Sequence, residues 1–171
     1  ASFYKGYKNN TQTFGTGVSN VVILFNSVEN NFGSDISLNT TTGIITLSSN
    51  KTYRIRGTVG HASFTTNDYF LYQWYNISNS TYIGNEVLFR VDGSGSETDE
   101  VDGICEVILT TTQSTDISLN LVSRGTQAAN ITISSQTNGY SWFDIEVIGG
   151  NAPVTNGTSG TSGSNGSSGT S

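Results

Sequence analysis

The sequence contains few of the side chains that usually perform catalysis or bind transition metals. It has one cysteine, Cys105, and one histidine, His61, in 171 residues, and it has no methionine. A single cysteine cannot form an intrachain disulfide, so the fold cannot depend on a disulfide framework. One cysteine and one histidine also exclude zinc sites made of clustered cysteine or histidine ligands. We therefore expect no resident transition-metal cofactor.

Charged residues are also scarce, and most of them are acidic. They make up 12% of the chain, about half of the roughly 25% found in an average soluble domain. Seven Lys and Arg residues oppose 13 Asp and Glu residues, which gives a formal net charge of −6. Nucleic-acid binding relies on a basic surplus that neutralises phosphates, and this chain lacks one. No apolar run approaches the ~18 residues of a membrane-spanning helix, so we expect no membrane insertion.

Composition divides the chain into three segments. Residues 17–150 contain most of the apolar residues and turn signals, and we expect them to form one globular domain. Residues 1–16 have weak periodicity, and we expect an N-terminal arm that anchors the domain to a particle shell. Residues 151–171 contain the only proline, no charge and no aromatic ring. We expect this last segment to be a tail outside the domain.

The tail has a strict glycine period. A collagen triple helix requires glycine at every third residue, because only glycine fits at its crowded axis. The triplets contain no proline, so a triple helix of this length would be weakly stable by itself. The spacing favours a collagen-like tail, and a flexible Gly/Ser linker is the alternative. The glycines in register are Gly157, Gly160, Gly163, Gly166 and Gly169.

The globular part has the two-residue periodicity of β-strands almost throughout. Apolar and polar residues alternate in 52–59, 117–121 and 142–147, and residues 21–25 form an apolar run typical of a strand covered on both faces. We count about nine or ten such strands, separated by turn signals, and no convincing helix. Period two places one face of each strand in a core. The sequence therefore predicts an all-β fold, either a β-sandwich or a jelly roll.

The order of several short motifs resembles the C1q/TNF-like jelly-roll domain. That domain has a typical order of V-x-F, N-x-G, TG-x-[FI]-T and G-x-Y pieces. No single piece is diagnostic, and the resemblance rests on their order over most of residues 15–148. The matching segments here are 20–33, 35–38, 42–47, 51–55, 73–76 and 140–145.

The resemblance implies a homotrimer, because members of this group form tight homotrimers and often join a collagen-like stalk. The Asn/Thr/Ser-rich composition is closest to versions found on viral capsid fibres and on bacterial collagen-like surface proteins. In C1q the collagen-like part precedes the head, whereas here it follows. We expect a non-enzymatic, trimeric head of a virion fibre, spike or capsid decoration, located at the virion surface and in contact with other capsid or surface proteins.

A different class of function is the alternative. The chain could be a lectin-like or receptor-binding head of a bacterial or spore surface protein, with a host glycan or receptor as its partner. Such a head needs a polar-aromatic pocket or a metal ion. Tyr72, Trp74 and Tyr82 could form a carbohydrate platform, although aromatic residues at alternating strand positions more often pack in a core or a subunit interface.

One acidic segment is a candidate for a calcium site. Oxygen-rich loops can hold Ca²⁺, and some C1q-like domains bind it. The spacing does not fit the EF-hand template, so a solvated connection between strands is the favoured interpretation. The candidate ligands are Asp92, Glu97, Asp99, Glu100 and Asp102.

The remaining candidates for chemistry are weak. Ser63 and Asp68 lie near His61 in the sequence, but no nucleophile motif supports a catalytic triad, and we expect no enzyme activity. Cys105 shares the period-two face of Val107, which predicts a buried and unreactive thiol. Acceptor motifs for N-linked glycans, which matter only if the chain meets a glycosylating system, include Asn39, Asn50, Asn76 and Asn130.

Overall fold

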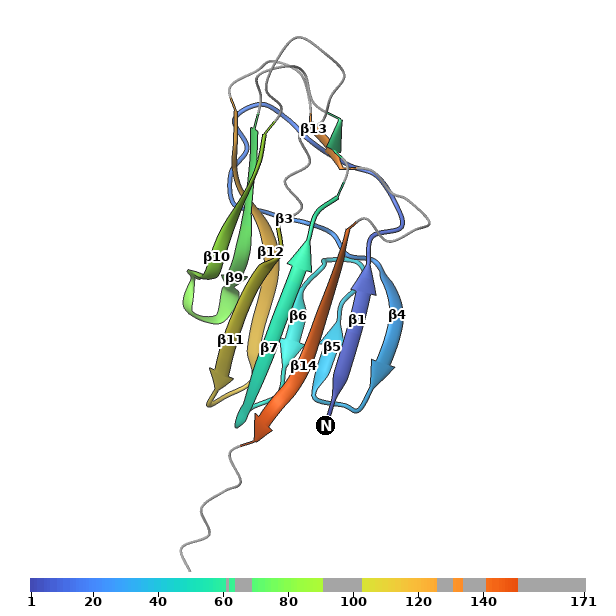
Figure 1. Ribbon diagram of the computed structural model, residues 1–171, viewed down its shortest axis with the longest axis vertical. Helices are drawn as coiled ribbons and strands as arrows, with labels where there is room; N and C mark the ends of the chain where they lie inside the picture. Colours follow the sequence, from blue (N-terminus) through green and yellow to red (C-terminus); the bar gives the residue numbers. More distant parts are fainter. Residues whose placement is uncertain (61, 64–68, 91–102, 126–130, 134–140, 151–171) are drawn as a thin grey trace, which may run out of the picture.

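The computed structural model describes residues 1–60, 62–63, 69–90, 103–125, 131–133 and 141–150. These residues form an antiparallel β-sandwich, and the described part contains no α-helix. The all-β prediction is confirmed. No helix among the described residues is long and apolar enough to cross a lipid bilayer. The ribbon in Figure 1 shows the strands running roughly parallel to the long axis of the molecule.

The sandwich has two main layers. Sheet I has five strands in the spatial order β11 (Cys105–Thr111), β7 (Lys51–Thr58), β14 (Trp142–Gly150), β1 (Phe3–Tyr7) and β4 (Ser27–Phe32). Sheet II contains β10 (Thr81–Arg90), β9 (Tyr69–Asn76), β12 (Thr115–Arg124), β6 (Ile45–Leu47) and β5 (Ile36–Leu38), and the short β3 (Val21–Val22) also pairs with β12. In Figure 1, β7, β14 and β1 lie in front of β6 and β5.

Two smaller elements complete the architecture. A three-stranded sheet joins β2 (Gln12–Phe14), β13 (Ile131–Ile133) and β8 (Ala62–Ser63) at the upper end of Figure 1. The connection between β9 and β10 is a single 3-10 turn, η1 (Ile77–Asn79). Its first turn is capped by the side chain of Asn76, which accepts a hydrogen bond from Asn79 N at 3.3 Å.

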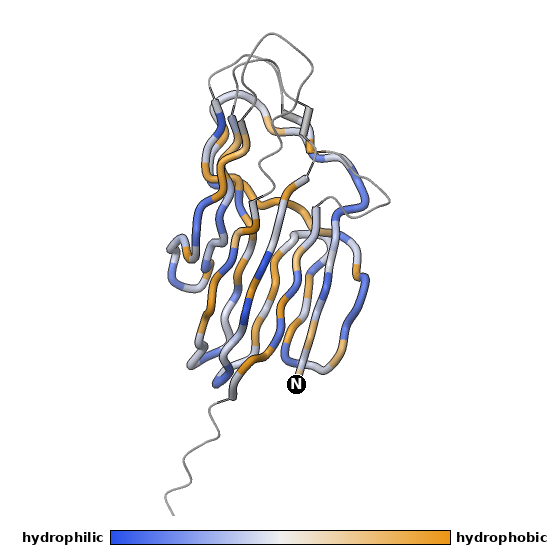
Figure 2. Tube along the Cα trace, viewed as in Figure 1, coloured by the Kyte–Doolittle hydropathy of each residue, from blue (hydrophilic) through white to orange (hydrophobic). Residues whose placement is uncertain are grey.

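The core lies between the two sheets and follows the alternation in the sequence. Figure 2 shows hydrophobic and hydrophilic positions alternating along several strands. Phe143 is the centre of an aromatic cluster: its ring centroid lies 5.9 Å from that of Tyr4, 5.0 Å from Phe25 and 6.4 Å from Trp74. Trp74 is fully buried and donates from Nε1 to the carbonyl of Cys105 at 3.0 Å. Its ring lies against β7 at a position without a side chain, because a Cβ on Gly57 would be only 2.9 Å from Trp74 Cζ2.

The expectation that residues 1–16 form an N-terminal arm is wrong for residues 3–7 and 12–14, which form strands β1 and β2 of the domain. Strand β1 is an inner strand of sheet I, paired with both β14 and β4. Its inward-pointing side includes Gly6, and the buried Lys8 follows directly after the strand; neither carries a hydrophobic signal, and this explains why the periodicity looked weak. Gly6 is required there because a Cβ atom would collide with the ring of Phe143. Strand β2 also belongs to the fold, with Phe14 buried.

Residues 21–25 also differ from the expectation of one continuous strand. Val21 and Val22 pair with β12, and Ile23 N donates to Leu119 O of β12 at 2.9 Å, but the backbone then turns, with Phe25 N donating to Ile23 O at 3.0 Å. Ile23 and Phe25 are nonetheless fully buried. The apolar run therefore marks a buried segment, and burial alone does not require strand geometry.

Candidate interaction surface

The outer face of sheet I is the most distinctive surface of the described residues. The strand registers place three rows of side chains across this face. The rows are Glu106, Arg56, Asp144 and Lys5; Ile108, Arg54, Glu146, Phe3 and Phe32; and Thr58, Trp142, Tyr7 and Ser27.

Ion pairs occupy the centre of this face. Arg56 grips Asp144 with two hydrogen bonds, from Nε to Oδ1 at 2.8 Å and from Nη2 to Oδ2 at 2.7 Å. The hydrogen bonds that Arg56 donates to the Asp144 carboxylate raise the pKa of the Arg56 guanidinium, although its partial burial opposes this effect. A second pair joins Arg54 Nη2 to Glu146 Oε1 at 2.7 Å. Bidentate pairs of the first kind fix side-chain geometry as well as charge.

One donor on this face has no acceptor among the described residues. Arg54 Nε is buried and makes no hydrogen bond in the part of the chain that the structure describes. A buried unpaired donor costs about 1–3 kcal/mol, so such groups are normally satisfied. An acceptor from outside the chain would remove this cost.

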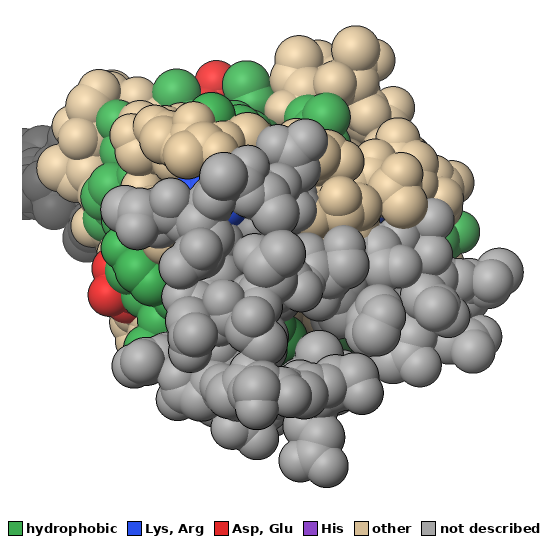
Figure 3. Space-filling view, turned by 90° about the horizontal axis from the view of Figure 1, so that it is seen from above, with side chains coloured by type: hydrophobic (Ala, Val, Ile, Leu, Met, Phe, Trp, Pro, Cys, Tyr) green, Lys and Arg blue, Asp and Glu red, His purple; other side chains and the backbone are tan. Residues whose placement is uncertain are grey.

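Exposed apolar side chains gather at the two edges of sheet I. At one edge Ile104 is 45% exposed and Ile108 is 62% exposed, and we call these two residues the β11 patch. At the other edge Phe32 is 68% exposed on the outer face, and we call this residue the β4 patch; Val28 is 45% exposed but pairs with the inward-pointing Gly6. In Figure 3, hydrophobic side chains are visible along the left margin, on the side of β10 and β11 in Figure 1. Solvated edge strands normally avoid such residues, because exposed apolar edges promote association.

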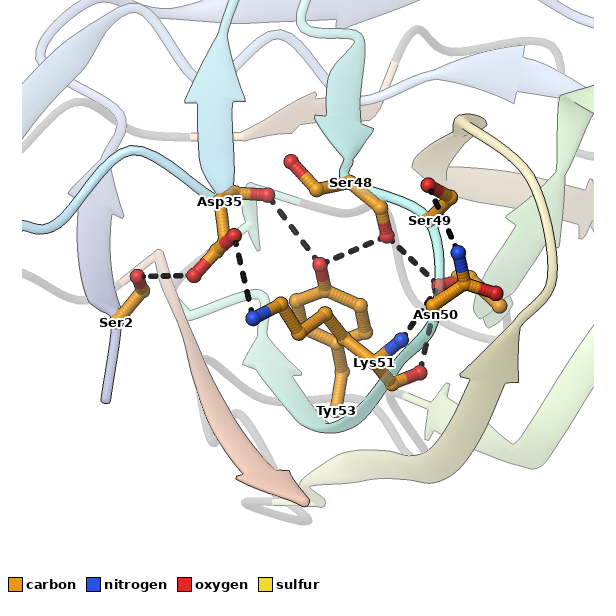
Figure 4. A network of polar contacts seen from close by, with 8 residues as sticks. Ser2, Asp35, Ser48, Ser49, Asn50, Lys51 and Tyr53 are labelled. Carbon is orange, nitrogen blue, oxygen red and sulfur yellow. Dashed lines mark hydrogen bonds and ion pairs between the residues drawn. The ribbon is translucent and has the colours of Figure 1, made fainter. Parts of the chain in front are cut away.

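A polar network closes the lower end of the sandwich, where β1 begins and β14 ends (Figures 1 and 4). Ser2 Oγ donates to Asp35 Oδ2 at 2.6 Å, and Lys51 Nζ lies 3.8 Å from Asp35 Oδ1. Tyr53 Oη donates to Ser48 O at 2.9 Å (Figure 4). Burial raises the pKa of Tyr53 to about 12, and the charge of Asp35 adds to this effect. The network ties the N-terminus to both sheets.

A buried lysine joins β1 to the segment before β4. Lys8 is 1% exposed, and its Nζ donates to Leu24 O at 3.0 Å and to Asn10 Oδ1 at 3.1 Å. No ion pair reaches it from the described residues. Burial therefore lowers the pKa of Lys8 to about 8. Sequence reasoning missed this residue, because one lysine beside Asn9 and Asn10 looks like part of a solvated loop.

The stability of the fold should depend on pH through Lys8. The unfolded chain keeps this proton up to its ordinary pKa of ~10.4, so above about pH 8 the unfolded state holds more protons than the folded state. The free energy of unfolding should therefore rise with pH, by roughly 0.5–1 kcal/mol per pH unit near pH 8. Lys8→Met should remove this rise. Urea unfolding of both proteins at several pH values tests it, because the contributions of Tyr53 and Cys105 cancel in the difference. Equal slopes for the two proteins would contradict it.

The structure places several predicted residues clearly. Cys105 is fully buried, and burial raises its thiol pKa to about 11, so the expectation of an unreactive thiol is confirmed. Tyr72 and Trp74 lie in the core rather than on a carbohydrate platform. Tyr82 is different, because it lies on the outer face of sheet II opposite Tyr75.

The glycan acceptors have different environments. Asn39 and Asn50 are exposed, so glycosylation at these two residues stays a prediction. Asn39 Oδ1 accepts hydrogen bonds from Thr41 N and Thr42 N at 3.0 and 3.2 Å. Asn76 is only 5% exposed and caps η1, so the fold leaves no room for a glycan there, and this prediction is wrong.

Other predicted site residues lie outside the described part of the chain. These include the five acidic candidates for a calcium site, and no group of metal-ligating side chains occurs among the residues that are described. The residues not described are His61, Asp68, Asn130, the tail 151–171 and the candidate ligands Asp92, Glu97, Asp99, Glu100 and Asp102.

Solved structures of other proteins are similar to this fold. No protein-family model and no curated protein matches the chain. Its structure is similar to the crystal structure of murine APRIL at pH 5.0, with a TM-score of 0.54 and 10% sequence identity over 84% of this chain and 96% of that one. It is also similar to the Eiger TNF of S. frugiperda, with a TM-score of 0.51 and 8% identity over 90% of this chain and 95% of that one. The chain therefore folds as a C1q/TNF-like jelly roll, as the motif order predicted.

Proposed function

We propose that this chain is the non-enzymatic head of a virion surface fibre, spike or capsid decoration, assembled as a homotrimer through the outer face of sheet I. One observation carries the proposal. Among the described residues, the exposed apolar side chains concentrate on sheet I, whereas the rest of the surface is mostly polar. Five of the six large exposed hydrophobic residues lie on this sheet or directly beside it: Val28, Phe32, Ile104, Ile108 and Ile148.

The position of the patches suits a closed ring of identical chains. The β11 patch and the β4 patch lie at opposite edges of sheet I and differ in their residues. A contact between two different patches is heterologous, and repeating it by a rotation that divides the full circle closes a ring. A two-fold dimer would instead need one patch that matches itself.

Two other features support a ring of three chains. The C1q/TNF-like fold resembles a group whose members form homotrimers, and the Gly-X-Y spacing of residues 151–171 suits a helix of three chains. Strand β14 ends at Gly150, at the lower end of the sandwich in Figure 1. Three heads would therefore deliver three tails to the same end of the assembly, where a collagen-like stalk could begin.

The surface composition supports a role outside the cell. A charged fraction of 12% with abundant Ser, Thr and Asn gives a weakly charged polar exterior. Such an exterior suits a particle surface in contact with other capsid or surface proteins, and a net charge of −6 does not favour nucleic-acid binding. Together with the order of the motifs, this composition supports a location at the virion surface.

Light scattering of the full chain tests the assembly. We expect a mass of three chains, and we expect the same for a chain that stops at Gly150, because the proposed contact uses only sheet I. A trimer that is lost on this truncation would move assembly to the tail. A single-chain mass for both proteins would overturn the proposal.

A further inference from the structure

The outer face of sheet II carries a second kind of surface, made of tyrosine and amide side chains. Tyr75 on β9 pairs directly with Tyr82 on β10, and both are partly exposed. Their ring centroids lie 4.9 Å apart with an interplanar angle of 62°. We call this surface the tyrosine–amide patch, and it consists of Asn20, Gln73, Tyr75, Tyr82 and Asn120.

Hydrogen bonds hold one side of the patch in place. Asn20 Oδ1 accepts from Tyr82 Oη and from Asn120 Nδ2, both at 2.8 Å. Asn120 Oδ1 in turn accepts from Ser118 Oγ at 2.6 Å. Asn120 and Ser118 are buried, so this chain of bonds starts inside the fold and ends at the surface. The orientation of the Tyr82 ring is therefore set before any ligand arrives.

The other side of the patch is also ordered. Gln73 Nε2 donates to Gly84 O at 2.8 Å. Gly84 has a positive φ of 76° and lies at the irregularity in the pairing of β10 with β9. This bond uses the amide nitrogen of Gln73, so its Oε1 is still able to accept a hydrogen bond. The irregularity in β10 thus supplies the carbonyl that holds the Gln73 side chain on the strand face that also carries Tyr75.

Three polar groups of the patch have no partner among the described residues. They are the hydroxyl of Tyr75, the side-chain carbonyl of Gln73 and the side-chain NH₂ of Asn20. The Tyr75 hydroxyl can both donate and accept a hydrogen bond, the Gln73 carbonyl can accept one, and the Asn20 NH₂ group can donate. The five residues of the patch carry no charge. These groups therefore match a neutral ligand with several hydroxyl groups better than an ion.

We propose that the tyrosine–amide patch binds a neutral pyranose sugar. The C–H face of the sugar would lie on a tyrosine ring, whose π face is electron-rich and attracts polarised C–H groups. The sugar hydroxyls would bond to Gln73 Oε1, Asn20 Nδ2 and Tyr75 Oη. This ligand uses both features that the patch combines, an apolar ring surface and fixed amide groups.

The site is open, so one sugar binds weakly. A surface that covers only part of a ligand gives affinities near the millimolar range, far from those of deep pockets. If the proposed trimer forms through sheet I, sheet II faces outward, and three sites are presented together. Avidity can then strengthen binding of a multivalent glycan by 10²–10⁴-fold. Binding of the single sugar does not depend on the trimer.

NMR titration of the full chain with glucose, galactose, mannose and N-acetylglucosamine tests the site. We expect at least one of these sugars to bind saturably at millimolar concentration and to shift the signals of residues 73–75 and 82. Tyr75→Ala should weaken binding at least tenfold, whereas Tyr75→Phe keeps the ring and should weaken it less. Gln73→Ala should also weaken binding.

Controls separate loss of the site from loss of the fold. Gln113→Ala removes another exposed amide, away from the patch, and should bind as the wild type does. All variants should keep the wild-type unfolding midpoint. If none of the four sugars binds, or if Tyr75→Ala binds as well as the wild type, the proposal is wrong. Light scattering of the same samples reports the oligomeric state, so failure of the trimer is distinguished from failure of the sugar site.

Discussion

Replacing Ile108 with aspartate should convert the proposed trimer into monomers that keep the fold. Ile108 is 62% exposed on the edge strand β11, in the same row as Arg54 and Glu146. A charge placed there would lose its water in the proposed interface and would add to the negative charge of Glu106 and Glu146, although its cross-strand neighbour Arg54 offsets part of this cost. Truncation of a central apolar contact costs about 2 kcal/mol or more. Because every 1.4 kcal/mol is tenfold in affinity, we expect association to weaken by at least ~30-fold per contact. Light scattering over a range of concentrations measures this change.

A matched control is available on the other sheet. Leu88 is 45% exposed on β10, and Leu88→Asp adds the same charge at an exposed apolar position outside sheet I. It should leave the trimer intact. Far-UV circular dichroism should show unchanged β-structure for both variants. A trimer that survives Ile108→Asp, or one that is lost equally with Leu88→Asp, would contradict the assignment of the interface.

Mixing two variants tests whether different edges meet. Phe32→Asp should also give monomers, because it places the charge in the β4 patch. Ile108→Asp retains an intact β4 patch, and Phe32→Asp retains an intact β11 patch. An equimolar mixture should therefore form dimers of one chain of each kind through a single undamaged contact. If the mixture stays monomeric, the two patches do not contact each other.

The second large effect concerns the core. Trp74→Ala should lower the free energy of unfolding by about 3–5 kcal/mol. Trp74 is fully buried, meets the Phe143 ring edge-on and donates a hydrogen bond to Cys105 O. Its removal leaves a cavity between the sheets and an unpaired carbonyl. Because small domains are stable by only about 5–15 kcal/mol, much of the stability would be lost.

Urea unfolding followed by circular dichroism measures this loss. It is best done in the Ile108→Asp background, because dissociation of a trimer would otherwise contribute to the apparent stability. Trp142→Ala is the matched variant: Trp142 lies on the outer face of sheet I and is only partly buried. It should destabilise the monomer less than Trp74→Ala does. Equal losses would mean that Trp74 is not the centre of the core.

Much of the fold could be predicted from local patterns. The alternation in residues 52–59 and 142–147 correctly identifies β7 and β14 and gives the face of each that is buried. It fails at β1, where the inward positions include Gly6 and the buried Lys8 follows directly after the strand. A glycine is needed there for the ring of Phe143, and the lysine is satisfied by Leu24 O and Asn10 Oδ1. These reasons lie in partners far along the chain, so a local pattern does not contain them.

The candidate surfaces were harder to predict than the fold. Arg56 and Asp144 are 88 positions apart in the sequence and form a bidentate pair only because β7 lies beside β14. The tyrosine–amide patch likewise joins Asn20 to Asn120, which are 100 positions apart. Tyr82 was singled out together with Tyr72 and Trp74, yet its true partners are Tyr75 and Asn20.

The sequence by itself determined that this chain is an all-β domain with a weakly charged surface, a jelly-roll order of motifs and a tail with glycine at every third position. Composition and two-residue periodicity are local properties, and they decide which side of a strand faces a core. Only the tertiary structure decided which strands are neighbours. A two-residue period is the same for every strand and therefore carries no information about its partner. Strand pairing brings β11 and β4 to opposite edges of sheet I and places the tyrosine–amide patch on sheet II, and so it decides where this protein can meet other molecules.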